Sequence, residues 1–107
     1  MSVPNISPQE LKRRLEAGES LQVLDVREPW EWAIVHLPDS LHVPLQELPR
    51  RLQELPKDRP IVALCKVGGR SRRAAEFLSG QGFQGVANLE GGIEAWRAAV
   101  DPSLPSY

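Results

Sequence analysis

Short apolar runs recur along the chain and predict β-strands. The clearest covers residues 60–65 (PIVALC), which are apolar on both faces, as in an interior strand of a parallel sheet covered by helices on both sides. Residues 21–26 (LQVLDV) and 85–90 (GVANLE) are similar, because they are apolar, partly β-branched and flanked by turn residues. A further strand is expected within residues 40–45 (SLHVPL), where Pro44 ends it.

Between these runs, apolar residues three and four positions apart predict helices. The first helix starts after Ser7, a capping residue, with Pro8 at the first helical position. Glu10 stands where it can complete a capping box, and Gly18 ends the helix. The other predicted helices are a short one from Pro29, one from near Pro49 to residue 55, one from Arg70 or Ser71 to about Ser79, and one over residues 91–100.

Strands and helices therefore alternate, with connections too short to separate domains. A chain of 107 residues has room for one hydrophobic core. We expect a single domain over residues 1–107, with residues 101–107 as an extended C-terminal tail. Its predicted fold class is α/β, a small and mostly parallel sheet of about five strands with helices on both faces. Ligands of such sheets bind beyond the carboxyl ends of the strands, here after residues 26 and 65.

Composition, net charge and the length of apolar stretches exclude several classes of protein. Apolar residues make up 41% of the chain and charged residues 25%, as in ordinary globular proteins. With a net charge of −1, no overall field attracts nucleic acid or an anionic membrane. The longest uninterrupted apolar stretch, Ile61 to Cys65, is too short to cross a bilayer, and the N-terminal residues do not resemble a signal peptide. We predict a cytoplasmic monomer that needs no metal or cofactor.

The segment CKVGGRS, residues 65–71, combines several features that favour a reactive thiol. It places the only cysteine at the end of a predicted strand and just before a helix, whose N-terminus stabilises a thiolate. The two glycines let backbone N–H groups turn inward and form a cup for an anion. Ser71 can cap the helix or donate a hydrogen bond to sulfur. We assign catalysis to Cys65 and substrate binding to the residues that follow it: Lys66, Val67, Gly68, Gly69 and Arg70.

The alternative for this segment is a buried structural cysteine followed by an ordinary turn, and a lone cysteine on an apolar strand is more often that. A thiol, two glycines, a cation and a helix start within seven residues are hard to explain by packing, which favours a nucleophile. Asp25 and Arg27 follow the strand at residues 21–26. They are either solvated or capping charges, or Asp25 pairs with Arg70 or with an amide of the cysteine loop.

Three segments resemble motifs of the rhodanese family, in the family's order. Residues 65–71 resemble its active-site loop, Cys-x-x-Gly-x-Arg-Ser/Thr. Residues 25–38 (DVREPWEWAIVHLP) resemble its upstream motif, Asp-x-Arg followed by an acidic-aromatic pair and Gly-His-Ile-Pro-Gly-Ala. Residues 89–96 (LEGGIEAW) resemble its closing Gly-Gly-x-x-x-Trp. Residues 6–19 and the tail VDPSLPSY also resemble rhodanese domains fused behind ubiquitin-activating-like adenylyltransferases, which pass sulfur to a carrier protein.

The resemblance implies the rhodanese fold and a sulfurtransferase activity. Cys65 would take a sulfane sulfur from thiosulfate or a protein persulfide, become a persulfide and pass the sulfur to a second nucleophile. Asp25, Arg27 and Ser71 are implied as supporting residues. The implied partners are a small anionic donor such as thiosulfate, and a cysteine desulfurase or a sulfur-carrier protein in molybdopterin, thiamin or tRNA thiolation.

The chain departs from the family pattern at Val35, where a glycine is usual. If that glycine has a positive φ, Val35 is strained or the turn is rebuilt. His36 matches the His-Ile-Pro segment and is expected to pack rather than to act as a base. Gly91 and Gly92 are expected to allow a tight turn between the last strand and the last helix.

Two other functions use a similar domain. Cysteine phosphatases and arsenate reductases have five residues between cysteine and arginine, whereas this chain has four. A shorter ring of amides fits one sulfur better than a tetrahedral phosphate. A non-enzymatic binding module is the third hypothesis, and the presence of Cys65 speaks against it.

Overall fold

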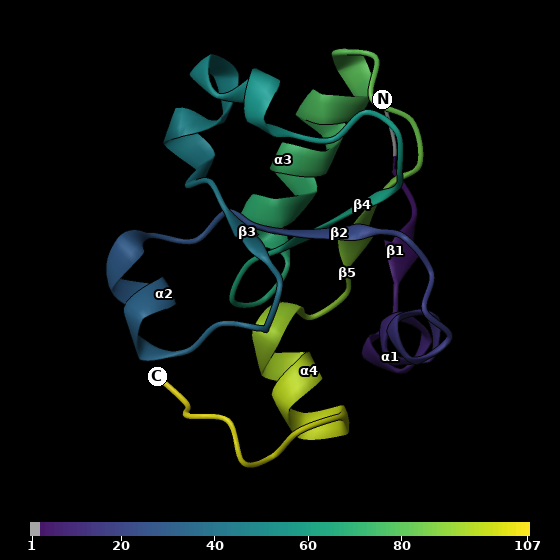
Figure 1. The fold of residues 1–107 in the computed structure, drawn as a ribbon. Coiled ribbons are helices and arrows are strands. Elements are labelled where there is room, and N and C mark those ends of the chain that lie inside the picture. Colours follow the sequence, from purple (N-terminus) through teal and green to yellow (C-terminus); the bar gives the residue numbers. More distant parts are fainter. Residues whose placement is uncertain (1–2) are drawn as a thin grey trace.

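The computed structural model describes residues 3–107, and a five-stranded sheet with only parallel pairs forms its centre (Figure 1). The strands lie in the order β1-β5-β4-β2-β3, which confirms the predicted α/β class with a sheet that is wholly rather than mostly parallel. The strands are β1 (Asn5–Ile6), β2 (Gln22–Asp25), β3 (Leu41–His42), β4 (Ile61–Leu64) and β5 (Val86–Leu89). The pattern did not predict β1, because its two residues are too few to show an alternation.

Helices cover both faces of the sheet. Alternate strand residues point to opposite faces, so each face carries apolar side chains that a helix buries. Ala63 of β4 belongs to a buried cluster with Ala74 and Leu78, while its neighbour Val62 belongs to a second cluster with Leu11 and Trp96. The first cluster lies under α3 and the two 3-10 helices, and the second lies under α1 and α4 (Figure 1). The helices are α1 (Pro8–Glu16), α2 (Pro29–Ile34), α3 (Gly69–Gly80), α4 (Gly92–Ala99), η1 (Leu45–Arg50) and η2 (Leu52–Glu54).

Two local predictions were wrong in detail. No regular helix begins near Pro49, which lies inside the 3-10 helix η1, and a second 3-10 turn follows it. A proline lacks the N–H that an α-helix needs, so this segment forms short turns that still bury Leu48. At α1, Ser7 accepts a hydrogen bond from the backbone of Glu10 as expected, but the Glu10 carboxylate binds Arg13 and does not complete the capping box.

The parallel register brings two chain segments together at one edge of the sheet. Asp25, the last residue of β2, stands opposite Leu64, the last residue of β4. The residues that follow these two strands therefore lie side by side, at the edge where α2 and α3 begin. In the described part of the chain, no helix has the length and apolar character needed to cross a membrane.

Candidate active site

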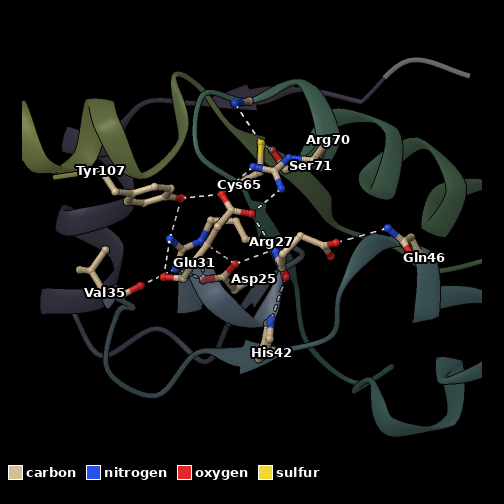
Figure 2. A network of polar contacts seen from close by, with 12 residues as sticks. Asp25, Arg27, Glu31, Val35, His42, Gln46, Cys65, Arg70, Ser71 and Tyr107 are labelled. Carbon is tan, nitrogen blue, oxygen red and sulfur yellow. Dashed lines mark hydrogen bonds and ion pairs between the residues drawn. The ribbon is translucent and has the colours of Figure 1, made fainter. Parts of the chain in front are cut away.

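Cys65 follows β4 directly and lies just before α3, as predicted. Its side chain is only 1% exposed. The sulfur accepts a hydrogen bond from the backbone N–H of Gly68 at 3.0 Å and lies 3.3 Å from the hydroxyl of Ser71 (Figure 2). The thiol is thus buried, and its neighbours direct their donors toward it.

Hydrogen bonds favour the ionised form of this thiol. Burial raises the pKa of Cys65, since a charge is costly away from water. The Ser71 side chain and the backbone N–H groups of Ser71, Gly68 and Val67 donate to the sulfur and outweigh that cost. The net pKa lies below the ordinary value of a thiol, which is the condition for a nucleophilic cysteine.

The backbone conformation of the cysteine loop requires glycine at only one of its two glycine positions. Gly68 has φ of +109° and adopts a left-handed conformation, which turns its N–H toward the sulfur. Gly69 is not among the residues with a positive φ, and a Cβ at Gly69 would meet nothing within 4 Å. The prediction that both glycines shape the loop is therefore correct for Gly68 only.

The Asp25 carboxylate forms a buried pair with Arg27. It accepts a hydrogen bond from the Arg27 backbone N–H at 3.0 Å and from the guanidinium at 2.9 Å and 2.8 Å. Both side chains have no exposed surface. The predicted pairing of Asp25 with Arg70 is wrong, because a nearer arginine, two residues along the same loop, occupies this carboxylate. Both side chains therefore lie beneath the surface of the protein.

The partner of Arg70 is Glu31, a residue that the sequence analysis did not select. The two Arg70 Nη atoms donate to the two Glu31 carboxylate oxygens at 2.6 Å and 2.9 Å (Figure 2). Glu31 is almost fully buried at the start of α2 and also accepts a hydrogen bond from the backbone N–H of Glu28. The Arg70 guanidinium, against the cost of burial, lowers the pKa of Glu31 to about 2. The acidic-aromatic pair of the family motif, here Glu31 and Trp32, is the sequence signal that could have distinguished Glu31 from Glu28, which a proline follows.

Tyr107, the last residue of the chain, is a second functional candidate that sequence reasoning missed. Its hydroxyl accepts a hydrogen bond from Arg27 Nη1 at 2.9 Å and donates one to Glu31 at 2.7 Å. Its ring lies under the ammonium of Lys66, with 4.6 Å between Nζ and the ring centroid. A distance of 80 residues along the chain separates Tyr107 from Arg27, so no local pattern could reveal the contact.

Asn88 of β5 is a third functional candidate that sequence reasoning missed. The Ser71 hydroxyl lies 2.5 Å from Asn88 Oδ1 and 3.3 Å from the Cys65 sulfur. A hydroxyl has one hydrogen, so Asn88 and Cys65 compete for it. Arg72 donates to Asn5 Oδ1, which also accepts from Asn88 Nδ2, and this arrangement leaves the Asn88 oxygen facing Ser71.

The substitution at position 35 causes no strain. Val35 has φ of −160°, an extended conformation that any residue adopts, and its carbonyl accepts a hydrogen bond from Arg27 Nη2 at 2.6 Å. The positive φ of this turn, +60°, belongs to Asp39 instead. His36 stacks on Trp32 with ring centroids 3.8 Å apart, in agreement with the expected packing role. His42 binds the Arg27 carbonyl through Nε2 at 2.8 Å.

The fold and the loop together define an α/β domain with a cysteine-based candidate site at the carboxyl end of its central strand. Residues 7–99 match the family model described as rhodanese-like domain. The chain belongs to the rhodanese-like domain family, which confirms the resemblance seen in three motifs of its sequence.

Individual relatives agree with this assignment. A sulfurtransferase of Allochromatium vinosum is 42% identical over 94 residues, which cover 88% of each chain. The thiosulfate sulfurtransferase GlpE of Pseudomonas syringae is 37% identical and covers 86% of this chain and 85% of GlpE. A crystal structure of a rhodanese-like domain protein from Staphylococcus aureus has a TM-score of 0.85 at 30% identity, and it covers 98% of this chain and 99% of that one.

The predicted relation to domains of adenylyltransferases is also confirmed. The probable adenylyltransferase/sulfurtransferase MoeZ of Mycobacterium tuberculosis is 38% identical over 104 residues. These residues cover 95% of this chain and 26% of MoeZ, so the similarity concerns one part of that longer protein.

Proposed function

We propose that this chain is a rhodanese-type sulfurtransferase in which Cys65 carries the sulfur. The single observation that supports this best is the convergence of loop donors on the Cys65 sulfur, led by the N–H of Gly68 at 3.0 Å. These donors lower the pKa of the thiol and are preorganised for a negatively charged sulfur. The similarity to GlpE supports thiosulfate as a donor.

The reaction proceeds by double displacement. The Cys65 thiolate attacks the outer sulfur of thiosulfate, a new S–S bond forms, and sulfite leaves with the electron pair of the bond that breaks. Cys65 then carries a persulfide anion. An acceptor nucleophile, such as cyanide or a thiolate, attacks the outer sulfur and releases the Cys65 thiolate with its electron pair. A protein persulfide donor would react in the same way, with its own thiolate as the leaving group.

The loop cations have different roles in this scheme. Arg70 is engaged by both oxygens of Glu31, so its charge is largely compensated and its main effect is to hold the loop in place. The Lys66 ammonium lies over the ring of Tyr107 and, within residues 3–107, forms no ion pair with an acidic side chain. Lys66 therefore supplies most of the attraction for an anionic donor.

Mass measurement of the purified protein tests the proposal. After incubation with thiosulfate, the wild-type chain is expected to gain one sulfur atom, and cyanide should remove it with formation of thiocyanate. Cys65→Ala should gain none. The matched control is Ser106→Ala, an exposed residue of the tail, which should gain sulfur like the wild type. If no sulfur adds to the wild type, or Cys65→Ala retains thiocyanate formation, the proposed function is wrong.

The same protein can be tested for the two alternatives. Hydrolysis of a phenyl phosphate ester without sulfur uptake would favour a phosphatase. Tight binding of a sulfur-transfer protein without turnover would favour a binding module. We propose that the acceptor or donor in the cell includes a sulfur-carrier protein or a cysteine desulfurase, on the basis of the similarity to MoeZ. Transfer of labelled sulfur from the Cys65 persulfide to such a protein tests this directly.

A further inference from the structure

The tail after α4 runs back toward the cysteine loop and is held at defined points. Arg97 of α4 donates from Nε to the carbonyl of Leu104 at 2.8 Å, and the Leu104 N–H binds the carbonyl of Asp101. Leu104 and Tyr107 pack against the buried cluster under α1 and α4. The chain end reaches the side of α2 as a result (Figure 1).

The hydroxyl of Tyr107 links two ion pairs, and the chemistry of its partners fixes which hydrogen bond it accepts and which it donates. An arginine can only donate and a carboxylate can only accept, so the hydroxyl accepts from Arg27 and donates to Glu31. On one side stands the buried Asp25–Arg27 pair, and on the other stands Glu31 with Arg70 (Figure 2). Without this hydroxyl, Arg27 Nη1 keeps only a long contact of 3.5 Å to the Glu31 carbonyl.

The ring of Tyr107 makes a separate contact with the other end of the loop. Lys66, the residue after Cys65, has its ammonium 4.6 Å from the ring centroid. The ring of Trp30 in α2 makes a T-shaped contact with the Tyr107 ring, at a centroid distance of 5.6 Å. Tyr107 thus contacts the start of the loop through its ring and the end of the loop, at Arg70, through Glu31.

We propose that Tyr107 is a positioning residue for the Cys65 loop, fixing Lys66 by its ring and Arg70 through Glu31, so that the loop stays closed around the sulfur. The catalytic consequence rests on the proposed function, whereas the closure of the loop does not. Two substitutions separate the two contacts. Tyr107→Phe removes the hydroxyl and keeps the ring, and Tyr107→Ala removes both.

Alkylation of Cys65 by iodoacetamide measures closure without any sulfur transfer. The thiol is 1% exposed in the closed loop, so modification reports the open state. Loss of hydrogen bonds to charged partners should raise the alkylation rate about tenfold in Tyr107→Phe. Tyr107→Ala should react faster still, while Ser106→Ala should react like the wild type. Far-UV circular dichroism and urea unfolding confirm that each variant is folded, and if Tyr107→Ala is not, the comparison rests on Tyr107→Phe.

Two further readouts distinguish positioning from general loss of stability. The KM for thiosulfate should rise in folded Tyr107→Ala by more than in Tyr107→Phe, with a much smaller change in kcat, because only Tyr107→Ala also releases Lys66, which supplies most of the attraction for the donor. The effects of Tyr107→Phe and Glu31→Gln on alkylation should be non-additive, because one acts through the other.

The proposal is overturned if folded Tyr107→Phe alkylates at the wild-type rate, if Ser106→Ala changes alkylation equally, or if the effects of Tyr107→Phe and Glu31→Gln are additive. Should the wild type take up no sulfur, the proposed function fails, and the alkylation rates still decide the role of Tyr107.

Discussion

The carbonyl oxygen of Cys65 accepts a hydrogen bond of 2.8 Å from the backbone N–H of Ile93, so the first turn of α4 is attached directly to the cysteine loop. The next N–H, of Glu94, binds the Lys66 carbonyl at 3.1 Å. The first N–H groups of a helix have no partner within that helix, and here two of them hold the backbone of the loop. Helix α4 therefore fixes the direction in which the loop presents its amides.

Gly92→Ala should disrupt this attachment. Gly92 has φ of +63°, and a Cβ there would stand 2.4 Å from the Lys66 carbonyl oxygen and 2.5 Å from the Cys65 carbonyl oxygen. Backbone strain and the forced shift of the loop should destabilise the protein by at least about 2 kcal/mol and reduce sulfur transfer more than tenfold. Urea unfolding and the thiocyanate assay measure both effects. Gly80→Ala is the control, because it has an ordinary φ and open space, and it should cost nothing.

Ser71→Ala and Asn88→Ala should shift the reactivity of Cys65 in opposite directions. Without the Ser71 hydroxyl the thiolate loses a donor, so the pKa of Cys65 rises. Without Asn88 the competing acceptor is gone, so the Ser71 hydrogen is donated to sulfur and the pKa falls. The pH dependence of the iodoacetamide rate measures the midpoint in each folded variant. A shift in the same direction for both would contradict the competition for one hydrogen.

Burial should decide how much a carboxylate in an arginine pair contributes to stability. Asp25→Ala leaves the Arg27 guanidinium unpaired where neither side chain is exposed, and it should destabilise the protein by about 3–5 kcal/mol. Glu10→Ala breaks a pair of similar bidentate geometry with Arg13 on the exposed face of α1. That change should move the urea midpoint little, because solvent screens the pair. Equal effects in urea unfolding would refute the role of burial.

Glu31→Gln should alter how stability depends on pH. The pKa of Glu31 in the folded protein is about 2, below the ordinary value of 4.5, so the folded state favours the carboxylate. This contribution is fully present above about pH 4.5 and is lost as the pH falls toward 2. The variant should be less stable than the wild type at pH 7, on the order of 2 kcal/mol after allowance for solvent at the partly exposed Arg70. The difference should shrink as urea unfolding is repeated at lower pH, and a constant difference would contradict the assignment.

Local patterns were sufficient for most of the architecture. The apolar run at residues 60–65 predicted β4, because a strand buried on both faces needs apolar residues at every position. The glycines and the cysteine at its end predicted a turn into α3 and a site for an anion. Where the pattern failed, at residues 45–55, the spacing of leucines was satisfied by 3-10 turns that bury the same side of the chain. Hydrophobic spacing reports which residues are buried more reliably than which helix type buries them.

The sequence by itself determined the α/β order, the parallel sheet and the position of the thiol, because these depend on residues close together along the chain. Only the tertiary structure decided which charges meet. Arg70 pairs with Glu31, 39 residues away, and Tyr107 joins this pair to the local pair of Asp25 and Arg27 from the far end of the chain. Ion pairs between distant residues depend on strand register and on the path of the tail, and a single sequence carries no local signal for either.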